Sequence, residues 1–186
     1  MPRDRSRSRS RSPAFPRYDV SDAEAFLVPL GVPKGLPQLK IKFGRKTCKG
    51  KATHFNKQRD VFLQRKPDVF WDPSIGTSTL VYFDPDAPNR SSDDGSRAGE
   101  FGPWLHWLVS ECQGGRPTSG REHIAHVGPS PPHGKHRYIM LLFRQKSGIK
   151  FPSGLERKRW DVGAFIKANE GILTPAAVNF FYCSNE

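Results

Sequence analysis

The chain has 186 residues, a size that suits one domain behind a short tail rather than two independent cores. Its 30 Lys and Arg against 18 Asp and Glu give a formal net charge of +12, which favours acidic partners such as phosphates, nucleic acid, anionic lipid or an acidic protein. No apolar stretch reaches the ~18 residues of a membrane span, no signal-peptide pattern is present and the three scattered cysteines are too few for a disulfide framework, so we expect a protein of the cytoplasm or nucleus. A monomer is the default expectation, because no pattern in the sequence indicates an oligomer.

A basic tail is the first predicted element. Arginine and serine alternate from Arg5 to Ser12, and residues 1–17 hold six arginines and one aspartate. Like charges repel and no apolar side chain offsets the entropy of ordering, so we expect residues 1–20 to be disordered. The alternation is similar to the Arg-Ser repeats of splicing-associated proteins. It predicts either a solvated segment without specific function or an adaptor that binds RNA, serves as a localisation signal or is phosphorylated by a kinase.

Residues 21–186 are expected to form a single domain. Ser21–Leu30 predicts a short helix, with Ser21 as its N-cap and Glu24 at the spacing of a capping box. From Leu39 to Phe43 apolar and basic residues alternate, which is typical of a half-buried strand. The basic residues that follow are expected in a loop or at an exposed strand edge: Arg45, Lys46, Lys49 and Lys51.

Three later segments predict strands. Ser78–Phe83 is β-rich and ends at an Asp-Pro-Asp-Ala-Pro loop, because each proline removes a backbone donor and fixes φ. In Trp104–Val109 the residues at odd and at even positions are both largely apolar, so both faces of this strand are expected to be buried. One of these faces would be formed by Trp104, His106 and Leu108. His136–Arg144 predicts a long strand with Tyr138, Met140 and Leu142 on the face of His136.

The last part of the chain predicts one helix near 161–170 and one strand. Asp161 stands at the N-cap, Gly171 stands at the expected stop, and an apolar stripe lies between them: Val162, Phe165 and Ile166. Ala177–Cys183 then predicts a final strand. Long-range strands with a single well-marked late helix favour a mainly β sandwich rather than βαβ units.

Two polar clusters are candidates for a functional site. In the first, made of Asp84, Asp86 and His106, the histidine is either a satisfied core residue or the polar floor of a pocket. A carboxylate bonded to one ring nitrogen would favour the protonated imidazole and aim the other N–H at an anion. In the second, the Pro/Gly-rich loop Gly128–Gly134 can expose backbone N–H groups, and Tyr138 behind it brings a hydroxyl.

Several uncommon strings occur in the order and spacing of one known family: DPDAPNR, WLHWLV, GPSPPHG, HRY, RWDVGAFIKAN and FFYC. From about Asp22 to Cys183 the chain resembles the phosphatidylethanolamine-binding protein family, whose members include kinase-cascade modulators, protease inhibitors and plant flowering regulators. The resemblance implies an antiparallel β-sandwich with a small pocket at the strand ends for phosphate-type anions, and a non-enzymatic role. Its ligand would be a phosphate-containing small molecule or a phospholipid headgroup, a protein kinase is an implied partner, and no metal or other cofactor is implied.

The resemblance also assigns roles to individual residues. Asp84 and His106 would form the central polar pair, with Tyr138 as a hydroxyl donor. The walls of the pocket would be Pro88, Trp104, Pro131 and Pro132. Asp86 and His136 would stand behind these residues and set their geometry. The chain departs from the family in the Phe101-Gly102-Pro103 lead into Trp104 and in having no extended helix after Cys183.

Catalytic alternatives remain beside this interpretation. Four of the six histidines fall within fourteen residues: His123, His126, His133 and His136. Together with Asp84 and His106 they could supply the ligands of a Zn²⁺ or Fe²⁺ enzyme. A serine or cysteine hydrolase is less well supported, because the sequence has no Gly-x-Ser-x-Gly elbow and no cysteine in a context that lowers its pKa. The basic stretches Arg45–Lys66 and Lys150–Arg159 are expected to be solvated faces.

Overall fold

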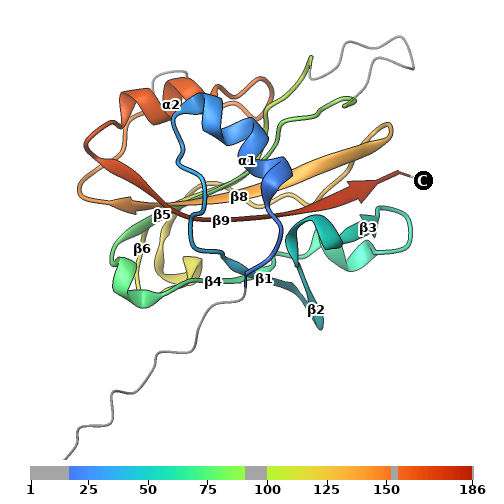
Figure 1. The fold of residues 1–186 in the computed structure, drawn as a ribbon, viewed down its shortest axis with the longest axis horizontal. Coiled ribbons are helices and arrows are strands. Elements are labelled where there is room, and N and C mark those ends of the chain that lie inside the picture. Colours follow the sequence, from blue (N-terminus) through green and yellow to red (C-terminus); the bar gives the residue numbers. More distant parts are fainter. Residues whose placement is uncertain (1–16, 91–99, 152–154, 186) are drawn as a thin grey trace, which may run out of the picture.

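The computed structural model describes residues 17–90, 100–151 and 155–185, which fold into two sheets with helices on one side (Figure 1). The large sheet has the strand order β3-β9-β8-β5-β6-β7 and the small sheet the order β2-β1-β4. β3 pairs with β9 in parallel, and the other neighbouring pairs are antiparallel. The mainly β sandwich is therefore confirmed.

The strands are β1 Lys40–Phe43, β2 Lys46–Thr47, β3 His54–Asn56, β4 Asp68–Phe70, β5 Ser78–Asp84, β6 Trp104–Cys112, β7 Arg121–Ile124, β8 Lys135–Gln145 and β9 Leu173–Ser184. The α-helices are α1 Ser21–Leu27 and α2 Val162–Ala168. Short 3₁₀ turns lie at Val28–Leu30, Gly50–Ala52, Val61–Gln64, Pro73–Ile75 and Pro117–Ser119. Among the described residues, no helix has the length and apolar character needed to cross a bilayer.

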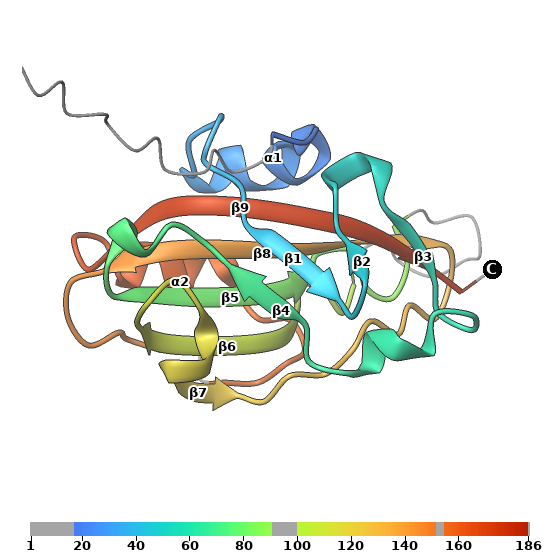
Figure 2. The ribbon, with the colours of Figure 1, turned by 90° about the horizontal axis from the view of Figure 1, so that it is seen from below.

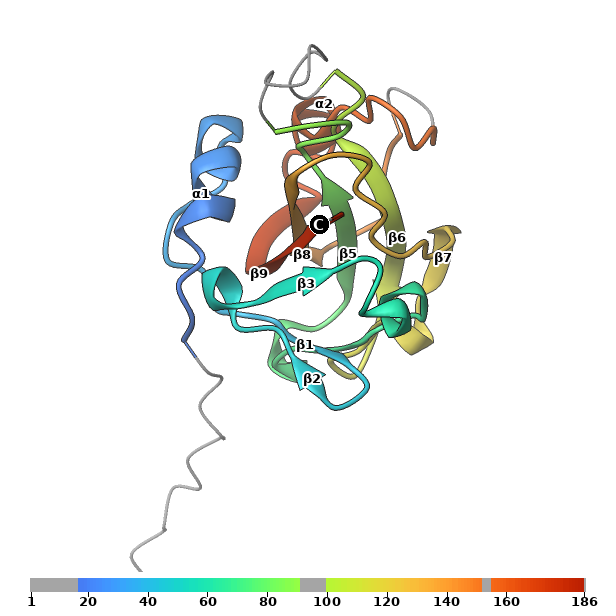
Figure 3. The same ribbon diagram turned by 90° about the vertical axis from the view of Figure 1, so that its right-hand side faces the viewer.

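Both faces of the large sheet are buried, which explains why its strands carry apolar side chains at odd and at even positions. One face packs against the small sheet, which crosses it in Figure 2, and the other carries α1 and α2 (Figure 3). β8 shows the alternation that its sequence predicts. Tyr138, Met140 and Leu142 lie in the core beneath the small sheet, and Ile139 and Leu141 lie in the core beneath the helices.

β6 departs from simple alternation. Trp104 and His106 line one cavity, but Leu108 does not share their face as predicted. In the pairing with β5, Tyr82 lies opposite Trp107, but the next residue, Phe83, lies opposite Leu105. His106 is therefore an extra residue without a partner on β5. Leu105 and Leu108 consequently face the helices, whereas Trp107 faces the small sheet. Such bulges redirect a side chain, and this one turns His106 toward Tyr82 and Tyr138.

The two predicted helix caps have opposite outcomes. Asp161 caps α2 as predicted, because its carboxylate accepts a hydrogen bond from the Ala164 N–H at 2.8 Å. The capping box at Ser21 is wrong, since Val20 occupies the N-cap without a side-chain bond and the Glu24 carboxylate instead accepts from the Gly35 N–H at 2.8 Å.

The start of the domain includes residues before Ser21. Val20 is buried, and the backbone of Tyr18 exchanges hydrogen bonds with the side chain of Gln38. The carbonyl of Asp19 accepts a hydrogen bond from the Lys51 N–H at 2.8 Å. The Arg-Ser repeat, predicted to be disordered, lies outside the described residues.

Candidate functional site

The candidate site is a cavity of about 420 Å³ where β5 ends and β6 begins, at positions paired through Asp84 and Trp104. We call it the Asp84 cavity. It is lined by Gln64, Asp84, Ala87, Pro88, Phe101, Trp104, His106, Val127, Gly128, Ser130, Pro132, Tyr138 and Arg157. The sequence separation of these residues shows that the fold, rather than any local segment, builds the cavity.

Most of the residues predicted for the pocket meet here. Six of them line the cavity: Asp84, Pro88, Trp104, His106, Pro132 and Tyr138. Pro131 is buried and is absent from the lining, so it does not form a wall of this cavity. Asp86 and His136 lie behind the lining residues, 4% and 0% exposed.

The carboxylate that was expected to bond His106 bonds His136 instead. Asp84 Oδ2 lies 2.7 Å from His136 Nδ1, and Asp84 Oδ1 accepts the Asp86 N–H at 2.8 Å. His136 Nε2 lies 2.9 Å from the carbonyl oxygen of His133. Burial disfavours the charged ring, but the bond and charge of Asp84 outweigh it and raise the pKa of His136 above 6.5. Burial also raises the pKa of Asp84, and His136 opposes that rise.

His106 is held by a carbonyl rather than by a carboxylate. Its Nδ1 lies 3.0 Å from the carbonyl oxygen of Val127. A carbonyl only accepts hydrogen bonds, so Nδ1 carries the proton. Burial lowers the pKa of His106 to about 3 despite that bond. The expected protonated imidazole is therefore wrong, and the ring is neutral at neutral pH.

Tyr138 provides a hydroxyl that remains protonated. Burial raises its pKa well above 10, and the negative charge of Asp84 adds to the rise. The phenol ring is fixed by stacking on Phe181, at 5.5 Å between centroids, and by the edge of His106, at 5.3 Å. The hydroxyl can therefore act as a hydrogen-bond donor at neutral pH.

Asp86 anchors the proline-stiffened loop after β5. Its carboxylate accepts hydrogen bonds from the backbone N–H of Arg137 at 2.8 Å, from Nε at 2.9 Å and from Nη2 at 2.6 Å. The same guanidinium donates to the carbonyl of Asp22 on α1 at 3.0 Å. The loop that carries Ala87 and Pro88 is thus tied to both β8 and α1.

Two glycines allow the other walls to close on the cavity. A Cβ atom on Gly102 would lie 2.6 Å from the carbonyl oxygen of Pro85, and one on Gly128 would lie 2.7 Å from Gln64 Cα. Gln64 also donates to the carbonyl of Pro129 at 2.9 Å. These close approaches fix the lip of the cavity and require the absence of a side chain.

Arg157 is the charged lining residue that sequence reasoning missed. It falls in a basic stretch expected to be a solvated face, yet its Nη1 donates to the carbonyls of Leu105 and His106 at 3.1 and 3.2 Å. Its Nη2 donates to the carbonyl of Ala125 at 2.8 Å. These bonds hold a guanidinium at the wall of the cavity, and no pattern near Arg157 in the sequence points to that contact.

The histidines proposed as metal ligands have separate surroundings. His136 is bonded to Asp84, His123 Nε2 lies 2.7 Å from the Ser110 hydroxyl, and His126 stacks on Tyr82 at 5.9 Å. Within the three described stretches, no group of three or more His, Cys, Asp or Glu side chains is placed to hold a metal ion.

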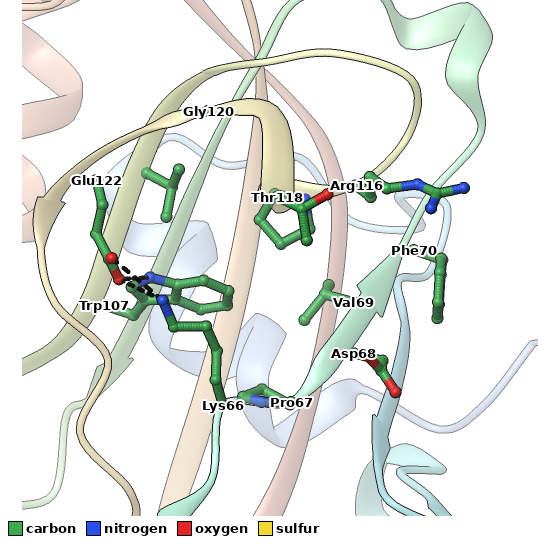
Figure 4. A pocket seen from close by; sticks show the side chains of 12 residues that line it. Lys66, Pro67, Asp68, Val69, Phe70, Trp107, Arg116, Thr118, Gly120 and Glu122 are labelled. Atoms are coloured by element: carbon green, nitrogen blue, oxygen red, sulfur yellow. Dashed lines mark hydrogen bonds and ion pairs between the residues drawn. The ribbon is translucent and has the colours of Figure 1, made fainter.

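A second cavity, of about 330 Å³, lies between β4, β6 and the turn before β7 (Figure 4). On one side Glu122 accepts hydrogen bonds from Trp107 Nε1 at 2.7 Å and from Lys66 Nζ at 2.8 Å, and Arg116 lies across from them beside Phe70. It shares no lining residue with the Asp84 cavity. None of the residues predicted for the site lines it.

The family assignment follows from comparison with known proteins. A family model described as "Phosphatidylethanolamine-binding protein" matches residues 37–181. The chain belongs to the phosphatidylethanolamine-binding protein family. Within this family, "CEN-like protein 4" of Nicotiana tabacum is 37% identical over 110 residues, which are 58% of this chain and 59% of the relative. "Protein SELF-PRUNING" of Solanum lycopersicum is 36% identical over 110 residues, with the same shares. The matched part spans less than two thirds of these relatives.

Two solved structures share the fold of this chain. A carboxypeptidase Y inhibitor, determined in complex with its cognate proteinase, gives a TM-score of 0.69 at 20% identity and covers 90% of this chain and 94% of its own. A phosphatidylethanolamine-binding protein from Plasmodium vivax gives 0.64 at 16% identity, covering 92% and 100%. At these identities the likeness shows the shared architecture.

Proposed function

We propose that this member of the phosphatidylethanolamine-binding protein family is a non-enzymatic binding and regulatory module whose Asp84 cavity accepts a phosphate-type group. The observation that carries the proposal is the meeting of Asp84, His106 and Tyr138, from three different strands, around one cavity that also has Arg157 on its wall. A cavity with a few convergent polar groups and apolar walls is the usual form of a small-ligand site.

Each polar group would have a distinct part in holding the anion. Tyr138 would donate its hydroxyl proton, and Arg157 would supply positive charge at the wall. Asp84 would repel the ligand if it stood alone, but its pairing with His136 offsets its negative charge. Hydrogen bonds to a charged group contribute about 1.5–3 kcal/mol each, so two or three of them suit a weakly bound, exchangeable ligand.

The reactive groups of the chain support binding rather than catalysis. All three thiols are free and buried, and burial raises the pKa of Cys112 and of Cys183 to about 12. Ser110 approaches His123, but it is only 1% exposed and lines neither the Asp84 cavity nor the cavity of Figure 4. A nucleophile needs both activation and access, and these groups do not combine the two.

Regulation would operate through occupancy of the cavity and through partner proteins. One structural neighbour is an inhibitor complexed with its cognate proteinase, so action by binding has a precedent on this fold. Modulation of a protein kinase and recognition of a phospholipid headgroup come from the family resemblance, and both stay predictions for this chain.

An NMR titration tests the proposed site. We expect phosphoethanolamine to shift the amide signals of Ala87, Gly128 and Ser130, and we expect His106→Ala to weaken binding by about tenfold, in line with the loss of one hydrogen bond. The matched control is Arg116→Ala in the cavity of Figure 4, which should leave the titration unchanged. Equal shifts in native protein and His106→Ala would rule out the assigned role of His106.

A further inference from the structure

The small sheet carries a basic surface on its outer side. The apolar residues of β1, Ile41 and Phe43, belong to the core, so the two lysines that alternate with them point outward. Two further cations are exposed at the turn into β2 and extend this charge around the edge of the sheet. In Figure 2 no described element lies over β1 from this side. We call these four residues the β1–β2 basic surface: Lys40, Lys42, Arg45 and Lys46.

The charge of this surface is not neutralised within the part of the chain that the structure describes. None of its four side chains takes part in an ion pair there, whereas Lys51 nearby pairs with Asp22. Asp68 of β4 lies opposite Lys42 and brings one carboxylate to the same side of the sheet. Against four cations this leaves a net positive surface, which suits an anionic occupant.

The described chain begins beside this surface. The backbone of Tyr18 exchanges hydrogen bonds with the side chain of Gln38, and Lys40 follows Gln38 by two residues. The tail, residues 1–17, is therefore joined to the domain next to the start of β1. Ser12 is the last serine of the Arg-Ser repeat and precedes Tyr18 by six residues, which span about 20 Å when extended. The four residues of β1 span only about 13 Å, so the repeat can reach all of them.

Phosphorylation would reverse the charge of the tail. Its six arginines and one aspartate give +5, which leaves +7 of the formal +12 for the rest of the chain, so the unmodified tail and the domain repel each other. Each phosphoserine carries about −1.5 to −2 at neutral pH. With the four serines of the repeat modified, the tail would carry about −1 to −3 and would be attracted to the basic surface.

The spacing of the repeat matches the spacing of the lysines on β1. In an extended chain, side chains two residues apart point the same way and lie about 6.6 Å apart. The serines of the repeat recur at every second position, as Lys40 and Lys42 do. The phosphates of an extended repeat would therefore line up with these lysines, while the arginines between them would point to the opposite side.

We infer that the phosphorylated tail docks in extended form along the β1–β2 basic surface, with its phosphates on Ser6, Ser8, Ser10 and Ser12. A serine kinase would transfer the γ-phosphoryl group of ATP to each hydroxyl oxygen. The new P–O bond replaces the bond from that phosphorus to the β-phosphate oxygen, and ADP and the hydroxyl proton leave. The unmodified tail is available to an acidic partner, and the phosphorylated tail is held by its own domain. This contact leaves the Asp84 cavity open, so it does not depend on the proposed function.

The test compares NMR spectra of the full chain with and without phosphoserine at the four positions. We expect phosphorylation to shift the amide signals of Lys40, Lys42 and Phe70, which lies opposite Lys40, at about 0.1 M salt. The signals should return to their unmodified positions at about 1 M salt, where the Debye length is about 3 Å rather than about 10 Å. Shifts confined to the lining of the Asp84 cavity, or no shifts at all, overturn the docking.

Two charge-reversal variants separate this surface from net charge alone. Lys40→Glu combined with Lys42→Glu removes the matched lysines, and we expect the shift of Phe70 on phosphorylation to fall by roughly threefold or more. The matched control combines Lys150→Glu with Lys167→Glu, two exposed lysines at or beside α2, and should keep the native shift. Equal losses in the two variants overturn the assignment of the surface.

A spin label tests the docking without changing the surface. All three native cysteines are buried, so a nitroxide reagent would react with the new thiol of Pro2→Cys. We expect the label to broaden the amide signal of Lys42 more strongly in the phosphorylated chain than in the unmodified chain, and to leave Lys167 unaffected in both. Equal broadening of Lys42 in the two forms overturns the inference even if the charge-reversal variant does not fold.

Discussion

His106 should make the folded protein sensitive to acid, and the size of the effect follows from its burial. Its pKa falls from 6.5 to about 3 on folding, so below pH 6.5 the unfolded chain binds a proton here that the native chain does not. Stability rises with pH wherever the unfolded state binds more protons. The stability that depends on a neutral His106 is therefore fully present above pH 6.5, and it is lost as the pH falls from 6.5 toward 3. A pH of about 5 lies about 1.5 units below the pKa of this residue in the unfolded chain, so the free energy of unfolding should be lower there by about 2 kcal/mol.

Urea unfolding of the native chain and of His106→Asn, at about pH 7 and about pH 5, measures this contribution. His106→Asn should lose about 2 kcal/mol less than native protein over that interval, because it has no imidazole to protonate. His126, whose pKa burial lowers to about 4, adds the same kind of slope to both proteins and cancels in the comparison. Thr118→Ala serves as a surface control with the native slope. Equal losses in native protein and His106→Asn would refute a neutral, buried His106.

Three further predictions concern the anchors of the site and the tail. Asp86→Asn should destabilise the protein by about 3–5 kcal/mol, because the buried Arg137 guanidinium loses its carboxylate partner. Glu100→Gln, at an exposed ion pair with Arg159, should cost less than about 1 kcal/mol. Similar urea unfolding midpoints for the two variants would contradict this. Gly128→Ala should weaken phosphoethanolamine binding in NMR titrations, because its Cβ would clash with Gln64, and Gly148→Ala, with nothing within 4 Å, should not. Deleting residues 1–17 should abolish salt-dependent RNA binding in a filter assay, and binding that survives the deletion would exclude the tail as the RNA contact.

Elements with a strong local pattern could be predicted from the sequence. β8 alternates as expected, and the Asp161 cap and the apolar stripe behind it specify α2. β3, β4 and β7 were not predicted, because strands of three or four residues have too little periodicity to stand out. Their existence depends on partners distant in the chain, such as β9 for β3.

The composition of the cavity was easier to predict than its hydrogen bonds. Family motifs placed Asp84, His106 and Tyr138 together, and they do line one cavity. The partner of Asp84 could not be read from the motifs, because His106 and His136 are both within reach of the same loop. The bulge in β6, which redirects His106, cannot be recognised in a segment whose odd and even positions are both apolar. Arg157 reaches the site through contacts that no local pattern records.

A crystal structure of the protein with phosphoethanolamine bound would test the central claim most directly. The account predicts the phosphate in the Asp84 cavity, with one oxygen within hydrogen-bonding distance of His106 Nε2 and another within reach of the Tyr138 hydroxyl. A phosphate bound elsewhere, for example beside Arg116, with the Asp84 cavity occupied only by water, would contradict it.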